Sequence, residues 1–229
     1  MALMLLPFLW AVVHQTGLMI PNLISEGYRS WWLYGAGALV YLLGERLLTK
    51  PMGIYVFGHE LTHALTGILS GARIHSFKAK STGGEVRLSK SNAFIALSPY
   101  IVPLYGLALI LVYLIVRSWW NFQHLKSAFE VGLGFALAFH VSLTIHALHK
   151  HQSDLKVMGF FLSGVLILLG NLLIFSAFGV SLFSKTPLLT DYCSSLMRDT
   201  RFAWKTTLDF GWRGSKKIYA FIEEKPWTR

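Results

Sequence analysis

The sequence has little cysteine and little charge. Its 229 residues include one cysteine, Cys193, which excludes a disulfide within the chain and leaves the redox compartment undetermined. Charged residues make up 14% of the chain and hydrophobic residues 54%, and the mean hydropathy is +0.50. A chain with these values is more apolar than an ordinary soluble domain. The chain also lacks internal repeats, low-complexity tracts and nucleic-acid recognition motifs. We therefore attribute its net charge of +10 to basic residues that face lipid headgroups, and expect no nucleic-acid partner.

Long apolar runs are plentiful. A helix needs about 20 apolar residues to cross a bilayer. Six segments of about this length follow one another, at 2–24, 31–49, 53–72, 92–117, 128–149 and 157–184. The first has no basic start and no clear small-residue cleavage site, so we interpret it as a membrane helix rather than a signal peptide. We expect an all-α integral membrane domain over 1–184, with about six transmembrane helices in contact with the lipid bilayer.

The remaining segment, 185–229, has a different composition. It mixes basic residues with aromatic ones, namely Trp204, Phe210, Trp212, Tyr219 and Phe221. Basic and aromatic residues together are typical of segments that lie at a membrane interface. We expect this tail to be interfacial, with a partner-binding role as the alternative.

The stretch "VFGHELTHALTGILSGARIHSF" places three ionisable residues in an apolar run. His59 and His63 are four residues apart, which puts both on one face of a helix where they can bind one zinc ion. Glu60 stands beside the first histidine and can act as a general base toward a water molecule on the metal. Ionisable residues inside a membrane are costly and indicate function. The pattern therefore predicts one zinc ion per chain with Glu60 as the catalytic base.

A catalytic zinc site needs a third protein ligand. The downstream residues with suitable side chains are Glu130, His140, His146, His149, His151 and Asp154. Glu130 lies near the start of its helix, at the membrane face opposite the motif. Asp154 follows a polar break and precedes a new helix, so it can fold inward. His146 and His149 remain possible ligands.

Three features in order resemble the site-2 protease type of intramembrane zinc metalloprotease, the M50 family, and are nearer to its shorter M50B-like branch. They are "FGHELTHALTGILSGARI", the stretch 72–90 with its two glycines, and "NAFIALSPYIVPLYGLALI". The resemblance covers about 52–159. Members of this family take the third ligand from an aspartate, which implies Asp154 here. The usual Asn, Pro and Gly neighbours of that aspartate are missing, and Ser-Pro-Tyr stands where Ala-Gly-Pro is common.

The resemblance implies hydrolysis of a peptide bond in or near a transmembrane segment of another membrane protein. An unwound substrate would pair with an exposed strand edge, which replaces its lost backbone hydrogen bonds. We expect a hairpin over 73–90 to supply this edge, with Gly83, Gly84, Glu85 and Val86 as the substrate-binding residues.

Other functions are compatible with the same residues. One is metal binding or transport, in which the histidines at 140, 146, 149 and 151 form a relay of sites. Another is a pseudoprotease that binds membrane segments without cutting them, and hydrolysis of a soluble substrate is a lesser alternative.

Basic residues in the short loops favour a site that opens to the cytoplasm. The compact chain suggests a bacterial plasma membrane.

Overall fold

The computed structural model describes residues 2–25, 31–48, 50–119, 123–149, 153–183 and 188–223. These residues form eight α-helices, two short 3₁₀ helices and one two-stranded antiparallel hairpin. The chain divides into two compact units. One joins Met1–Glu26 with Phe175–Arg229, and the other is Gly27–Ile174.

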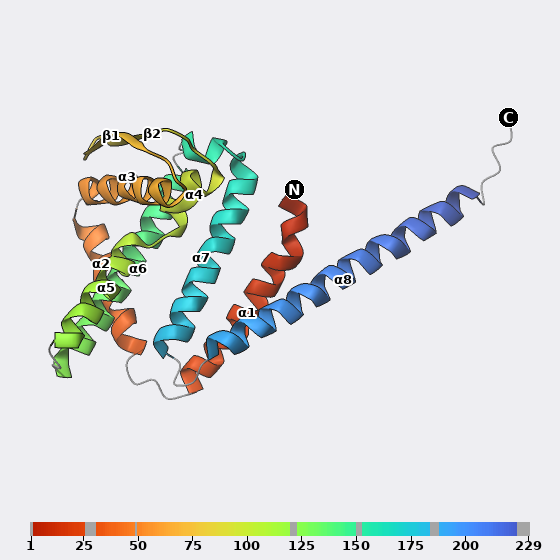
Figure 1. Ribbon diagram of the computed structural model, residues 1–229. Helices are drawn as coiled ribbons and strands as arrows, with labels where there is room; N and C mark the ends of the chain where they lie inside the picture. Colours follow the sequence, from red (N-terminus) through yellow and green to blue (C-terminus); the bar gives the residue numbers. More distant parts are fainter. Residues whose placement is uncertain are drawn as a thin grey trace. The chain divides into compact units, whose positions relative to one another are not determined.

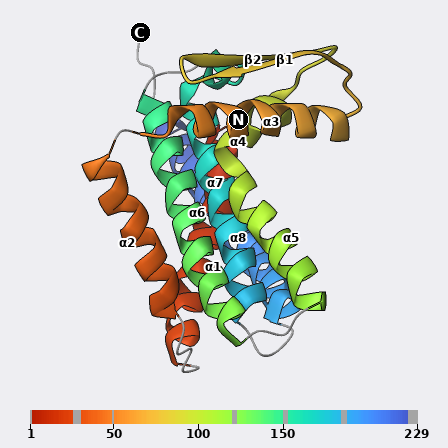
Figure 2. The same cartoon turned by 90° about the vertical axis from the view of Figure 1, so that its left-hand side faces the viewer.

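The unit Gly27–Ile174 is a helical bundle with a hairpin at one end. Its elements in chain order are α2 (Trp31–Leu47), α3 (Met52–Leu69), β1 (Ile74–Lys80), β2 (Gly83–Leu88), α4 (Ala93–Ile101), α5 (Leu104–Trp119), α6 (Gln123–His149), η2 (Ser153–Lys156) and the first part of α7 (Phe160–Phe183). Helix α6 packs against α2 on one side and α5 on another (Figure 2). Helix α3 lies across one end of α5 and α6, and the hairpin runs along it (Figure 1).

Glycines allow α2 and α6 to approach each other closely. A Cβ atom on Gly37 would overlap the backbone oxygen of Val131, and one on Gly134 would overlap the backbone oxygen of Tyr34. Small residues let helix backbones meet in this way, which is common where helices associate within membranes. The α2–α6 pair is therefore packed backbone against backbone.

Helix α3 ends in a turn that starts the hairpin. Gly71 has φ +73°, the left-handed conformation that glycine adopts at low cost. The amides of Gly71 and Ala72 donate to the carbonyl oxygens of Ile68 and Gly67, both at 2.8 Å. This is the Schellman arrangement of hydrogen bonds. It reverses the chain so that the strands run back along α3.

The predicted hairpin is confirmed. Strands β1 and β2 pair antiparallel, with Phe77 opposite Val86 and Ala79 opposite Gly84. The turn between them is formed by residues 81 and 82, so both glycines of the Gly-Gly pair lie in strand β2. The edge of β2 away from β1 has no strand partner within the described residues.

The structure confirms that the chain has helices able to cross a membrane, but it does not confirm that there are six of them. By length and composition, the spans Leu125–His149 and Phe160–Phe178 are long and apolar enough to cross a membrane. Helices α4 and α5 make a third span if they count as one, although they are bent by 69°. The break falls at Val102 and Pro103, where proline has no amide hydrogen to continue the helix. The other expected spans are helical in the described residues but do not meet this test.

Segment 53–72 corresponds to α3, which differs most from the expectation. The helix lies across the bundle (Figure 1) and is not among the described helices that could cross a membrane. Its two histidines and its glutamate lower its hydropathy, which is the physical reason. The predicted motif therefore stands on a helix at the end of the bundle.

The other unit contains η1 (Ala2–Leu5), α1 (Leu6–Ser25), the end of α7 and α8 (Leu188–Glu223). Helix α1 packs against α8, and both His14 and Gln15 contact the Asp199 carboxylate at 2.7 Å. Along α8, Met197, Leu208 and Trp212 are more than half exposed. Most of the predicted tail is thus one amphipathic helix. Its interfacial location stays a prediction, and the side chains of Tyr219 and Phe221 lie outside the description.

Candidate metal centre

Helix α3 presents the three motif residues to the protein interior. His59 and His63 are each 8% exposed and Glu60 is 9% exposed. The two imidazole rings lie one helical turn apart with their centres 4.8 Å from each other. The spacing predicted that both rings share a face of the helix, and the structure confirms this arrangement.

The third residue comes from the 3₁₀ turn η2, between α6 and α7. The Oδ2 atom of Asp154 lies 3.3 Å from His59 Nε2 and 3.4 Å from His63 Nε2. Ligands at 2.0–2.2 Å from one tetrahedral ion are about 3.4 Å apart. These three residues form the group within the described residues that could hold a metal ion. Two imidazoles and a carboxylate suit a divalent transition-metal ion, and three protein ligands leave one position for water.

Contacts behind His63 fix which nitrogen faces the group. Its Nδ1 lies 2.8 Å from the backbone oxygen of Ile95. Because a carbonyl oxygen only accepts, Nδ1 carries the proton of the neutral ring and Nε2 keeps a lone pair for a metal. Ile95 is itself held at the start of α4, where its amide donates to the Asn92 side chain at 2.8 Å. The N-cap of α4 therefore orients a ligand on α3.

His59 has a weaker partner on its own helix. The Tyr55 hydroxyl lies 3.5 Å from His59 Nδ1, one turn earlier on α3. The Tyr100 ring packs edge-on against the His59 ring, with centres 5.2 Å apart. Packing and a long polar contact hold this ring, whereas a short hydrogen bond holds His63.

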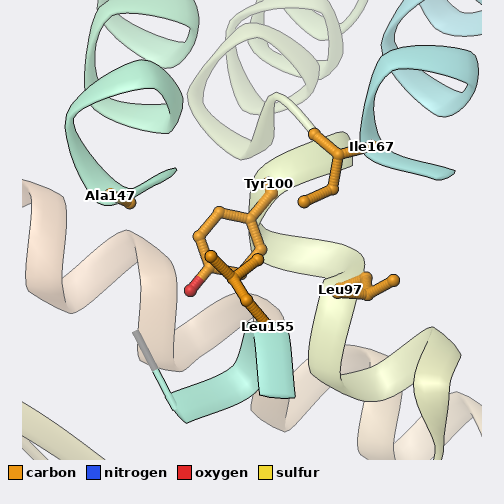
Figure 3. Packing of buried hydrophobic residues seen from close by; sticks show 5 residues of the cluster. All are labelled: Leu97, Tyr100, Ala147, Leu155 and Ile167. Carbon is orange, nitrogen blue, oxygen red and sulfur yellow. The ribbon is translucent and has the colours of Figure 1, made fainter. Parts of the chain in front are cut away.

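Asp154 is held in place by the bundle rather than by its own turn. The Tyr100 hydroxyl donates to Asp154 Oδ2 at 2.9 Å. The next residue, Leu155, is 1% exposed and packs in a core cluster with residues of α4, α6 and α7 (Figure 3). The Ser163 hydroxyl donates to the Leu155 backbone oxygen at 2.9 Å. These contacts draw η2 toward α3.

The carboxyl group of Asp154 is an ion at neutral pH. Its burial raises its pKa, but hydrogen bonds and charge interactions with His59 and His63 lower the pKa by more, to well below its usual range. A ligand carboxylate must be deprotonated to bind a metal. Asp154 meets this requirement without a further base.

A cleft of about 1020 Å³ opens beside these residues. Its walls include the metal-binding group, Glu60 and strand β2, so all four predicted substrate-binding residues line it: Gly83, Gly84, Glu85 and Val86. A Cβ atom on Gly84 would come within 2.5 Å of Glu60 Cγ and 2.7 Å of Val56 Cγ1. Strand β2 thus passes directly over Glu60.

The structure does not bring the other predicted ligands to this group. His140 Nε2 lies 3.2 Å from Asn171 Oδ1, and His149 Nδ1 contacts a backbone oxygen of its own helix. Glu130 is in the first half of α6, is 1% exposed and pairs with Lys126 at 3.7 Å. His146 lies in α6 outside the group. The remaining candidate, His151, lies outside the described residues.

Sequence reasoning missed several residues around the group. Tyr55 precedes His59 by one helical turn, a spacing that predicts contact. Tyr100 and Ser98 belong to Ser-Pro-Tyr, where the chain departs from the common family pattern. The Ser98 hydroxyl lies 2.9 Å from that of Thr66 on α3, so both polar residues of this segment contact the site's framework. His75, which lines the cleft, had no sequence signal.

Comparison with known proteins adds no relative. No protein-family model matches the chain, and neither the curated proteins nor the solved structures contain a match. The interpretation of this site therefore depends on its own residues and geometry.

Proposed function

We propose that the chain is an intramembrane zinc metalloprotease, of the M50 type that its motifs resemble. It hydrolyses a peptide bond in or near a transmembrane segment of another membrane protein. The observation that carries this proposal is the group formed by His59, His63 and Asp154, together with Glu60 in the same cleft. An HExxH helix with a carboxylate as third ligand is the donor arrangement of zinc hydrolases.

Each residue has a defined role in the proposed reaction. His59, His63 and Asp154 would hold the zinc ion, which when bound would make water nucleophilic and polarise the scissile carbonyl. The Glu60 carboxylate takes a proton from the attacking water as its oxygen adds to the carbonyl carbon. When the carbon–nitrogen bond breaks, Glu60 returns this proton to the leaving amine nitrogen. One water is consumed, and a carboxylic acid and an amine are formed, between which a proton then passes to give carboxylate and ammonium.

Strand β2 is the proposed docking edge for the substrate. A helical segment hides its carbonyl groups in its own hydrogen bonds, so it must unwind before it can be cut. Strand β2 lines the cleft and has no strand partner on its second edge within the described residues. An extended segment added to this edge would lie beside Glu60, against which Gly84 already packs.

The bilayer setting supports a membrane-protein substrate. We propose that the chain is a multi-pass protein of a bacterial plasma membrane, with the cleft open to the cytoplasm. At least two described helices are apolar and long enough for this role. Residues of α3 and of the hairpin line the cleft. Helix α3 lies across the end of the bundle (Figure 1), and we propose that water reaches the metal through this cleft.

The first experiment measures zinc in detergent-purified protein. We expect one ion per chain in wild type and in Glu60→Gln, and none in His59→Ala. Cleavage is measured in liposomes that contain the enzyme and fluorescence-quenched peptides with a single membrane span and a Gly-Pro pair in its middle. Glu60→Gln should abolish this cleavage. If wild type fails to bind supplied zinc, the proposal is wrong.

The same variant separates the alternatives. A metal transporter needs no base beside its ligands, so Glu60→Gln would leave zinc flux into liposomes unchanged. A pseudoprotease would bind single-span peptides and cleave none of them. The metal-transport hypothesis has less support, because His140 and His149 make contacts away from the metal group.

A further inference from the structure

We propose that Tyr100 is a positioning residue of the metal centre: its hydroxyl group holds the Asp154 carboxylate in the orientation in which Oδ2 faces both histidines. This inference rests on the metal site of the proposed function but not on proteolysis.

The contact joins two elements that are far apart in sequence. The Tyr100 hydroxyl on α4 donates to Asp154 Oδ2 at 2.9 Å, and the same oxygen lies 3.3 Å and 3.4 Å from the two histidines. A carboxylate rotates about its χ2 bond with little resistance. A donor on one oxygen removes this freedom, so the tyrosine selects which oxygen meets the metal.

The turn η2 offers Asp154 no equivalent support. Its neighbours are Ser153 and Leu155, and Leu155 is buried in the core cluster. Apart from the two histidines, Tyr100 is the partner that the structure shows on this carboxylate within the described residues. The orientation of the third ligand therefore depends on a residue of another helix.

Tyr100 is itself rigidly placed. It is 1% exposed, and its ring lies among Leu97, Ala147, Leu155 and Ile167, with the hydroxyl oxygen pointing out of this cluster (Figure 3). Its backbone oxygen accepts a hydrogen bond from Asn171 Nδ2 on α7 at 2.8 Å. A donor fixed by packing loses little conformational freedom when it binds its acceptor. The packing of the α4–α6–α7 core therefore fixes the position of the Tyr100 hydroxyl group beside Asp154.

The test is Tyr100→Phe, which keeps the ring and removes the hydroxyl group. Affinity for Zn²⁺ is measured by competition with a chromophoric chelator in detergent, and the visible spectrum of bound Co²⁺ reports the coordination geometry. We expect binding to weaken by about 10–100-fold, as when other supporting partners of metal ligands are lost. The Co²⁺ spectrum should also change. Tyr192→Phe is the matched control, because its buried hydroxyl group has no hydrogen-bond partner within the described residues.

A double-mutant cycle separates positioning from packing. In an Asp154→Ala background, where two histidines retain weak binding, Tyr100→Phe should cause no further loss. An equal loss in both backgrounds, or none in either, would overturn the proposal while leaving the metal site intact. If wild type binds neither ion, the proposed function fails and this inference fails with it.

Discussion

Helices α3 and α8 both expose apolar side chains, but α3 also buries three ionisable ones. On α3, His59, Glu60 and His63 are at most 9% exposed. On α8, Leu208 and Trp212 are 64% and 65% exposed. A buried ionisable group needs partners inside the protein, whereas an exposed apolar side chain needs a covering from outside. The internal contacts of α3 therefore define its chemistry, and those of α8 leave its partner to be found by experiment.

The strongest challenge to this comparison is removal of a metal ligand. Asp154→Ala should release the metal, because two histidines alone bind weakly. Asp191→Ala is the control, since Asp191 is an exposed carboxylate in the first turn of α8. Metal content by mass spectrometry should fall only in the first variant. Full metal in Asp154→Ala would show that another residue completes the site.

Glycines provide the next comparison. At Gly84 a Cβ atom would meet Glu60 and Val56, so Gly84→Ala must displace either strand β2 or the Glu60 side chain. A catalytic group that is displaced by about 1 Å can lower the reaction rate about 100-fold. Peptide cleavage should therefore fall while the zinc content is unchanged. Normal cleavage by this variant would remove β2 from the proposed active site.

Membrane contact of α8 is expected to show smaller effects. With Cys193→Ser as background, a nitroxide on Leu208→Cys should be more accessible to oxygen than one on Thr206→Cys, which lies on another face of α8. Accessibility is measured by electron paramagnetic resonance of the full chain in liposomes. Equal accessibility at the two positions would contradict an interfacial α8, and short distances between labels on two chains would indicate that a second copy covers this face.

The smallest expected effect is at Gly211 of α8. A Cβ atom there has no heavy atom within 4 Å, so Gly211→Ala removes only the low helix propensity of glycine. This change should stabilise α8 by about 1 kcal/mol without altering zinc content or cleavage. Thermal unfolding followed by circular dichroism is the measurement. A loss of stability would mean that something covers Gly211 in the membrane.

Some features of the site could be predicted because they are local. The four-residue spacing of His59 and His63 requires only helical geometry, and the hairpin follows from a short segment with its own turn. The residue types alone left Asp154 among several candidates, because its position depends on how η2 packs against α3, and the family resemblance singled it out. Tyr100 was missed because no periodicity connects residue 100 with residue 154.

Membrane topology was harder to predict than the grouping of the motif residues. Apolar composition indicates a membrane, but it does not show whether a helix runs along the bundle or across it, as α3 does. The segment 92–117 was predicted as one span, and Pro103 was overlooked as the point where it bends. The mean hydropathy of a segment does not show the effect of one proline, whereas a single proline can decide where a helix ends.

The backbone contact between α2 and α6 has a consequence for motion. At Gly37 and Gly134 there are no intervening side chains whose rotamers can rearrange, so the two helices form a fixed frame. Opening of the cleft would then displace the elements that line it, namely α3, the hairpin, α4 or η2, against this frame. Amide hydrogen exchange should be slow and insensitive to metal along the paired faces of α2 and α6. In η2, at the end of α6, it should slow when metal binds.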